Sequence, residues 1–171
     1  QEASRKLGFQ ARRTMKAAQE LYEGVEIKGQ GSMGLITYMR TDSLRISEDA
    51  IREATEYIET RWGGKYLPSK PRHFKSRANA QDGHEAIRPA SIAITPEAVK
   101  DSLTADQYKL YKLIWERFIA CQMANCVLNT TQATISAGKY IFKASGFNVA
   151  FEGFTALYEE SKDEEEKAGK D

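Results

Sequence analysis

The chain has 171 residues, 41% of them hydrophobic and 29% charged, and its 25 lysines and arginines nearly balance 24 aspartates and glutamates. This composition excludes an intrinsically disordered chain, and it contains no run of about 18 apolar residues, the length that spans a membrane. A chain of this length can bury one main core, with room for a small second unit. It begins at Gln1 without a methionine or an apolar signal sequence, so we expect a piece of a longer cytoplasmic polypeptide with no membrane partner.

Charge is distributed unevenly along the chain. Residues 159–171 contain seven acidic and three basic side chains, a net charge of −4, so residues 1–158 carry +5. We expect this acidic tail to be disordered. Residues 1–16 and 62–81 are rich in lysine and arginine and could meet phosphate groups, although runs of charge more often form ordinary solvated surfaces.

The two cysteines, Cys121 and Cys126, lie five residues apart in a helical pattern. Side chains at this spacing point in different directions, so a disulfide between them is not expected. Neither a Cys-x-x-Cys motif nor closely spaced histidines occur, which argues against a zinc site. We therefore expect two reduced thiols in the core of a cytoplasmic protein.

Residues 10–22 are predicted to form the first amphipathic helix. Its apolar side chains recur at helical spacing and should form the buried face: Ala11, Met15, Ala18 and Tyr22. Two short runs rich in β-forming residues, 25–27 and 35–39, then flank a glycine-rich segment and predict a β-hairpin with a loose loop. Tyr38 and Arg40 would share one face at the end of its second strand.

Two further helices carry capping signals. Ser47 can cap a helix over residues 48–62, which a glycine pair should end. Thr104 begins a capping box before a helix over residues 105–123, whose wide apolar face is typical of a main core helix. The segment 67–82 lies between these helices and should be an exposed, irregular loop, because it has two prolines and few apolar residues.

Beyond residue 125 the apolar pattern changes to alternation, which predicts strands. These strands lie near residues 131–135, 140–144 and 149–151, with turns expected at Gly138 and Gly146. About thirty residues of sheet are close to the lower limit for independent stability. We therefore expect them to belong to a second domain that is only partly present.

Polar residues gather where the predicted hairpin ends. Tyr38 and Arg40 would project together, and Asp42 and Ser43 follow them. This arrangement could bind an anion. A half-buried tyrosine beside a surface arginine is the simpler interpretation, because tyrosines commonly pack on strands, and spacing alone favours it.

A second polar cluster spans residues 84–89, with the sequence HEAIRP. One helical turn would place His84 and Arg88 on the same face, while Pro89 favours an extended Arg88 and ends the turn. The motif is not His-Glu-x-x-His, so a zinc protease is disfavoured. On spacing alone, His84 is best interpreted as a structural histidine.

Residues 34–43 and 84–89 resemble the two signature segments of bacterial type IA DNA topoisomerases of the topoisomerase I branch. The similarity continues through residues 3–9, 66–68, 79–81, 113–115 and 121–123. Met39 and Arg88 resemble the topoisomerase I branch, since the topoisomerase III branch usually has proline and Ile-Ile at these places. The topoisomerase part of reverse gyrase stays an alternative.

The resemblance implies a fold that is mainly α, with a winged-helix-like β-hairpin in the domain that bears the nucleophile. Residues 1–125 would form this domain, and residues 126–158 would be a short antiparallel part of a β-rich arch. In the family, a tyrosine at the position of Tyr38 attacks a DNA strand and becomes joined to the 5′ phosphate. The strand is later rejoined without ATP, and negative supercoils relax.

The resemblance implies that His84 assists cleavage at the same site. We further expect Arg40 to position the scissile phosphate, because its planar guanidinium suits a phosphate. We infer that Asp42 accepts a hydrogen bond from the His84 ring and fixes its tautomer. Further DNA contacts are expected from four side chains: Arg88, Ser43, Lys75 and Arg77. Arg88 could instead brace its own loop.

The family holds Mg²⁺ in a separate acidic fold, and the chain contains no Asp-x-Asp motif. We therefore expect the metal in another domain of the intact enzyme, none in this chain, and no relaxation by this chain alone. Its partners would be single-stranded DNA and the remaining domains of the longer polypeptide. The competing hypothesis is a non-catalytic winged-helix module in which Tyr38 stacks on a base of single-stranded DNA.

Overall fold

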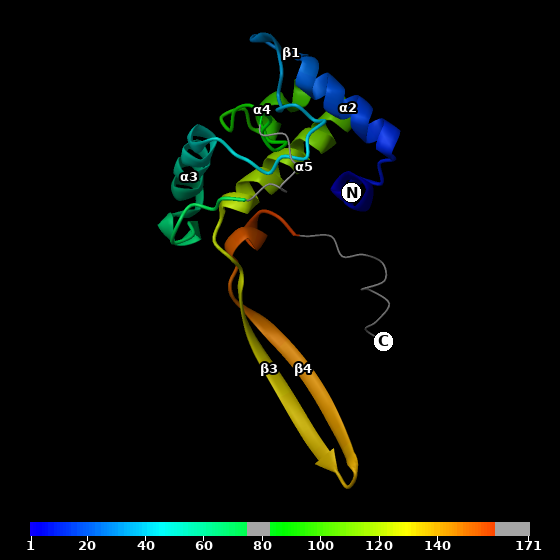
Figure 1. The fold of residues 1–171 in the computed structure, drawn as a ribbon, viewed down its shortest axis with the longest axis vertical. Helices are drawn as coiled ribbons and strands as arrows, with labels where there is room; N and C mark the ends of the chain where they lie inside the picture. Colours follow the sequence, from blue (N-terminus) through cyan, green and yellow to red (C-terminus); the bar gives the residue numbers. More distant parts are fainter. Residues whose placement is uncertain (75–82, 160–171) are drawn as a thin grey trace.

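The computed structural model describes residues 1–74 and 83–159. The described elements are α1 (Glu2–Leu7), α2 (Ala11–Glu23), β1 (Val25–Ile27), β2 (Gly31–Met33), α3 (Glu48–Trp62), α4 (Pro96–Val99), α5 (Ala105–Gln122), β3 (Val127–Ala137) and β4 (Tyr140–Phe151). The helices gather into one body, and β3 and β4 project from it as a long hairpin (Figure 1). Lys75, Arg77 and the predicted acidic tail beyond Glu159 lie outside the described residues.

Helix α5 is the central helix of the body, as predicted. The Thr104 side chain accepts a hydrogen bond from the Gln107 backbone N–H, and the Gln107 side chain accepts one from the Thr104 backbone N–H, which completes the capping box. Its buried apolar side chains include Leu110, Tyr111, Trp115, Phe118 and Ile119. The Trp115 ring N–H is satisfied by the Ile92 carbonyl at 3.2 Å, so the indole is buried without losing a hydrogen bond.

Helix α3 also follows the prediction. Ser47 caps it by accepting a hydrogen bond from the Ala50 N–H at 3.4 Å. Ile51, Ala54 and Ile58 form its buried face. Both helices could be predicted because their caps and apolar faces are encoded within a few consecutive residues.

The buried face of α2 differs from the prediction. Ala17, Ala18 and Leu21 face the core, whereas Met15 and Tyr22 are 37% and 41% exposed. The two adjacent alanines allow α2 to lie close against α5. The face that carries them is therefore the buried one, and Met15 and Tyr22 point toward solvent. Arg13 supports this packing through two hydrogen bonds of 2.6 Å to Asp106, which hold the pKa of that carboxyl below its usual value.

The predicted hairpin has a different second strand. β1 pairs antiparallel with β2, with Val25 opposite Met33, so residues 35–39 lie beyond the hairpin. The chain instead returns to the end of α2, where the Leu35 N–H donates to the Leu21 carbonyl at 2.7 Å. Tyr38 and Arg40 therefore do not share a strand face. The winged-helix-like description stays a prediction.

Strands β3 and β4 form one continuous hairpin. Ala137 pairs with Tyr140 around Gly138, which has a φ of 60°. The turn predicted at Gly146 was wrong, because this glycine pairs with Thr131 inside the ladder. The side chains of β3 are exposed throughout, and those of β4 are exposed up to Ala150. The assignment of these strands to a second domain stays a prediction.

The base of this hairpin is tied to the helical body by backbone contacts. The Phe154 N–H donates to the Ala124 carbonyl at 2.9 Å, and the Ala124 N–H donates to the Tyr66 carbonyl at 2.7 Å. Gly153 lies at this crossing with a φ of 53°. Cys121 and Cys126 flank the junction and are not joined in a disulfide, and both are half-buried rather than in the core as predicted.

We expect the amides of β3 and β4 to exchange hydrogen quickly in the isolated chain. A two-stranded ladder whose side chains are exposed gains little burial energy, so it should open well below the global free energy of unfolding. Hydrogen exchange followed by mass spectrometry should show weak protection in β3 and β4 and strong protection in α5. Equal protection in the hairpin and in α5 of a monomer would contradict this expectation.

Two buried tyrosines should make stability sensitive to alkaline pH. Burial, followed by a hydrogen bond to Glu2, raises the pKa of Tyr158 to about 12, and burial raises the pKa of Tyr111 above the ordinary tyrosine value near 10. Unfolding releases both phenols to ionise, so stability is fully present below about pH 10 and is lost as pH rises toward about 12. Urea unfolding across this range should show the loss.

The matched variant for this test is Tyr111→Phe. In the wild-type chain the Tyr111 hydroxyl donates to the Ile94 carbonyl at 2.6 Å. Loss of this hydrogen bond should lower the free energy of unfolding by about 1 kcal/mol at neutral pH. The variant should also lose less stability between about pH 10 and about pH 12, because one raised pKa is gone. An unchanged alkaline slope would contradict the assignment.

None of the helices in residues 1–74 and 83–159 combines the length and the apolar composition needed to cross a bilayer.

Candidate active site

The two signature segments lie side by side. Residues 35–37 and 88–90 form a short antiparallel bridge, with Ile36 opposite Pro89. The Thr37 N–H donates to the Arg88 carbonyl at 3.0 Å, and the Ala90 N–H donates to the Leu35 carbonyl at 2.9 Å. Residues about fifty apart in sequence are thereby fixed in one register. The segment 84–88 is irregular, so the helical turn predicted for His84 and Arg88 was wrong.

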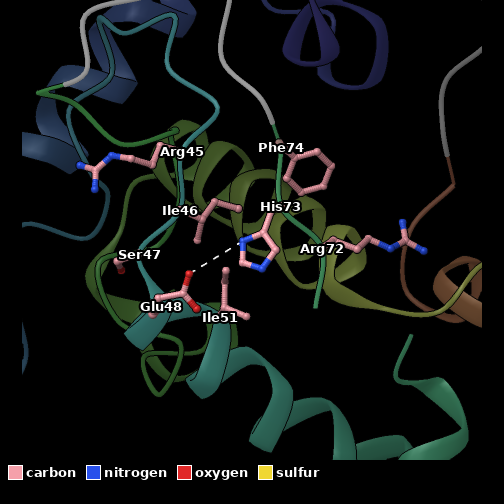
Figure 2. A pocket seen from close by; sticks show the side chains of 8 residues that line it. All are labelled: Arg45, Ile46, Ser47, Glu48, Ile51, Arg72, His73 and Phe74. Carbon is pink, nitrogen blue, oxygen red and sulfur yellow. Dashed lines mark ion pairs between the residues drawn. The ribbon is translucent and has the colours of Figure 1, made fainter. Parts of the chain in front are cut away.

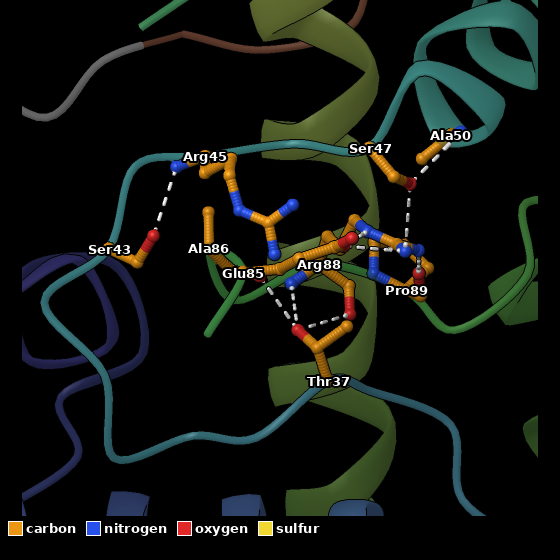
Figure 3. Close-up of polar contacts among 9 residues, drawn as sticks. All are labelled: Thr37, Ser43, Arg45, Ser47, Ala50, Glu85, Ala86, Arg88 and Pro89. Atoms are coloured by element: carbon orange, nitrogen blue, oxygen red, sulfur yellow. Dashed lines mark hydrogen bonds and ion pairs between the residues drawn. The ribbon is translucent and has the colours of Figure 1, made fainter. Parts of the chain in front are cut away.

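Thr37 fastens the two segments with its side chain (Figure 3). Its hydroxyl donates to the Ala86 carbonyl at 2.7 Å and accepts from the Arg88 N–H at 2.9 Å. Thr37 was not among the predicted site residues. Its one signal is its place directly before Tyr38, where a β-branched side chain with a hydroxyl can bind a neighbouring backbone.

Tyr38 is half-buried at the edge of the core, between two aromatic rings. Its ring centroid lies 5.2 Å from that of His84 at an interplanar angle of 37°, and 5.4 Å from that of Tyr22 at 64°. The structure therefore brings Tyr38 and His84 together, as the family resemblance implied. Tyr22 was predicted to be a buried packing residue, and its position beside Tyr38 was missed.

Arg40 and Asp42 follow Tyr38 on an exposed loop. Among residues 1–74 and 83–159 the structure gives Arg40 no ion pair, so its guanidinium can reach a ligand. Asp42 makes no hydrogen bond to His84 in this part of the chain, which differs from the expected contact. Both side chains are exposed, whereas Met39 and Ser43 on the same segment are buried.

Arg88 is held by its own loop. Its guanidinium donates to Glu85 and to the Pro89 carbonyl at 2.7 and 2.8 Å, with a longer bond of 3.4 Å to Ser47. The Arg88 side chain is only 15% exposed. The structure thus shows the bracing interaction, and the expected DNA contact of Arg88 stays a prediction.

Ser43 is also occupied within its loop. The residue is 5% exposed, and its hydroxyl accepts from the Arg45 N–H at 3.2 Å. The Ser43 N–H donates to the Thr41 hydroxyl at 3.0 Å. These bonds shape the turn after Tyr38, and a direct DNA contact by Ser43 stays a prediction.

The chain was found to match a known protein family. A family model described as DNA topoisomerase matches residues 1–170. The chain belongs to the DNA topoisomerase family. The family prediction made from the two signature segments is thereby confirmed.

Curated topoisomerases are close relatives of this topoisomerase chain. DNA topoisomerase 1 of Rickettsia felis is 51% identical over 168 residues, and that of Rickettsia prowazekii is 50% identical over 170 residues. These matches cover 96% and 98% of the chain, but only 22% of each relative. The chain thus spans about a fifth of the length of the curated relatives it matches.

A solved topoisomerase has the same fold. The structure of full-length topoisomerase I from Thermotoga maritima is 40% identical to this topoisomerase chain, with a TM-score of 0.79. The match covers 95% of this chain and 26% of that one. The arrangement of the helices and the projecting hairpin is therefore shared with a topoisomerase I.

A small polar pocket lies beside the loop that follows Tyr38 (Figure 2). Its volume is about 240 Å³, and it is lined in part by Arg45, Ser47, Arg72 and His73. His73 reaches Glu48 at 3.8 Å, and the arginine guanidinium groups extend away from the pocket on opposite sides. The lining charges therefore do not converge on one point in this topoisomerase chain.

Within residues 1–74 and 83–159, no three histidine, cysteine, aspartate or glutamate side chains are grouped so that they could hold a metal.

Proposed function

We propose that this chain is the nucleophile-bearing part of a DNA topoisomerase I that cleaves and rejoins one DNA strand to relax negative supercoils. The observation that carries the proposal is the place of Tyr38, beside His84 on a segment that Thr37 fastens to the second signature segment. The close relatives are named DNA topoisomerase 1 and are much longer. We therefore infer that the chain works within a longer cytoplasmic polypeptide whose substrate is DNA.

In the proposed reaction, the Tyr38 hydroxyl oxygen attacks the phosphorus of a DNA phosphodiester. A tyrosine–phosphate bond forms, the bond from phosphorus to the 3′ oxygen breaks, and the 3′ oxygen leaves as a hydroxyl after taking a proton. The 5′ phosphate stays on Tyr38. The reverse attack by the 3′ hydroxyl restores the strand, and ATP is not needed because the phosphotyrosine keeps the bond energy.

The neighbouring side chains supply charge and protons. Arg40 is exposed and would hold the oxygens of the scissile phosphate, where negative charge develops in the transition state. His84 lies against Tyr38 and would donate a proton or hydrogen bond to the same phosphate. Asp42 and His84 are not hydrogen-bonded to each other in the described structure. We propose that Asp42 orients the His84 ring only once DNA is bound.

Magnesium is proposed to act from another part of the longer polypeptide. When bound, it would supply positive charge near the DNA phosphates. The described residues of this chain hold no cluster that fits the ion, so their part in the reaction is binding, orientation and attack.

Adduct formation in the full-length enzyme tests the proposal. A single-stranded oligonucleotide with different labels at its two ends is incubated with enzyme and Mg²⁺, and the reaction is stopped with denaturant. We expect a covalent adduct that keeps the 3′ label, because Tyr38 would hold the 5′ phosphate of the downstream piece. An adduct that keeps the 5′ label would overturn the proposed linkage.

Tyr38→Phe is the matched control, since it removes only the hydroxyl. We expect no adduct and unchanged binding of single-stranded DNA. An adduct in this variant would overturn the role of Tyr38. A substantial loss of binding would favour the competing hypothesis, in which Tyr38 is a stacking platform.

A further inference from the structure

We propose that Tyr22 is a positioning residue that holds the Tyr38 ring in the orientation needed for attack. Tyr22 lies in the last turn of α2, and its ring packs edge-to-face on Tyr38, with 5.4 Å between centroids. This inference rests on the proposed function of Tyr38. It adds a residue that neither signature segment contains.

The backbone builds this contact. The Leu35 N–H donates to the Leu21 carbonyl at 2.7 Å, so the segment that carries Tyr38 is fastened to the end of α2. Gly34 permits the approach, because a Cβ on this residue would lie 2.7 Å from the Tyr22 carbonyl oxygen. The side chains of Tyr22 and Tyr38 are thus held next to each other by main-chain geometry.

Tyr38 depends on such neighbours because it is not part of a regular strand. Its buried flanking residues, Ile36 and Met39, fix the backbone but leave the half-buried ring to be held by what packs against it. The Tyr22 and His84 rings lie against it at interplanar angles of 64° and 37°. Together they restrict the side-chain rotamers that Tyr38 can adopt, and the rotamer about its Cα–Cβ bond decides where the hydroxyl oxygen lies.

Tyr22 does not contribute to the core in the way that a packing tyrosine would. It is 41% exposed, whereas Tyr38 packs against the core cluster. Loss of the Tyr22 ring should therefore affect the geometry of Tyr38 more than the stability of the body. Misplacement of a reacting group by about 1 Å can cost up to a hundredfold in rate, so a lost ring contact is measurable in cleavage.

The test compares Tyr22→Ala and Tyr22→Phe in the full-length enzyme, with single-turnover cleavage measured at saturating single-stranded DNA. We expect Tyr22→Ala to lower the cleavage rate by about tenfold, with DNA affinity changed by less than about twofold. Tyr22→Phe keeps the ring and should restore the rate. A wild-type rate in Tyr22→Ala, or a Tyr22→Phe rate as low as that of Tyr22→Ala, overturns the inference.

Glu23→Ala is the matched surface control, since it removes the adjacent exposed side chain from the same turn of α2. It should leave cleavage unchanged, and thermal unfolding of both alanine variants checks that the fold is intact. If Tyr22→Ala unfolds early, Tyr22→Leu replaces it and should show the same loss of rate. An adduct in Tyr38→Phe would defeat the proposed function, whereas a wild-type rate in the Tyr22 variants alone would defeat only this inference.

Discussion

Arg40→Lys should lower the rate of DNA cleavage by the full-length enzyme by about a hundredfold, which is the usual cost of losing one donor to transition-state charge. A free tyrosine has a pKa near 10, so only about 0.1% is ionised at pH 7 and ionisation costs roughly 4 kcal/mol. A positive charge about 4 Å away, at an effective dielectric near 20, supplies on the order of 4 kcal/mol. Arg40 would divide this field between the phenol and the phosphate.

Lysine is a poor substitute for Arg40 because the two cations differ in shape. The guanidinium is planar and offers paired N–H donors that match two phosphate oxygens, whereas an ammonium acts as a point charge. Arg40 is exposed and two residues from Tyr38, so the fork can meet the phosphate that Tyr38 attacks. We therefore expect the loss in the cleavage step rather than in DNA binding.

Arg45→Lys is the matched control for Arg40→Lys. Arg45 is another exposed arginine of the same loop, and it has no proposed role at the phosphate. Single-turnover cleavage and DNA binding should both stay near the wild-type values in this variant. A near-normal cleavage rate in Arg40→Lys would contradict the role proposed for Arg40.

The second large effect concerns stability. Gly153→Ala should lower the free energy of unfolding by roughly 2–4 kcal/mol, because two separate costs act at one position. Gly153 has a φ of 53°, a conformation that L-residues rarely adopt. A Cβ there would also lie 2.3 Å from the Asn125 carbonyl oxygen, and this neighbour is backbone that cannot swing away.

Two other glycines separate these costs. A Cβ on Gly146 would meet no atom within 4 Å, and its φ is not positive, so Gly146→Ala should change stability little. Gly8, which ends α1 in the helical body, has a φ of 65° and also has open space around it, so Gly8→Ala reports the backbone cost alone. Urea unfolding of the three variants should rank Gly153→Ala as by far the most damaging. Equal midpoints for all three would contradict the close approach at the hairpin base.

The sequence predicted the elements whose signals are local. Ser47 and the Thr104 capping box mark where α3 and α5 begin, and the apolar faces of both helices lie within the same few turns. Alternation predicted strands in the region of β3 and β4 for the same reason, although it divided β4 at Gly146. Each of these features depends on residues that are near one another in the chain, so no knowledge of tertiary contacts was needed.

The errors fall where distant segments meet. The second strand of the hairpin was assigned to residues 35–39, but these residues bond to α2 and to the segment around Pro89 instead. The same contacts decide which face of α2 is buried and bring Tyr22 beside Tyr38. Hydrophobic periodicity cannot report them, because it describes one element at a time.

The candidate site shows a similar division. Spacing alone favoured a packing tyrosine and a structural histidine, and only the resemblance joined Tyr38 to His84, as the structure now does. Thr37 was missed because its role depends on the carbonyl of Ala86, which is far away in sequence. For Arg88, bracing of its own loop and contact with DNA were equally favoured by the sequence. The ion pair between Arg88 and Glu85 depends on the path of the loop, which the sequence does not show.

The projecting hairpin affects how the isolated chain behaves at high concentration. The outer edges of β3 and β4 are unpaired in the described structure, and the ladder exposes several apolar side chains, among them Ile135, Ile141, Phe142 and Phe147. Long open edges with apolar faces readily recruit strands from other molecules. Lys139 and Lys143 place positive charge near the tip, so salt that screens this repulsion should promote self-association of the purified chain.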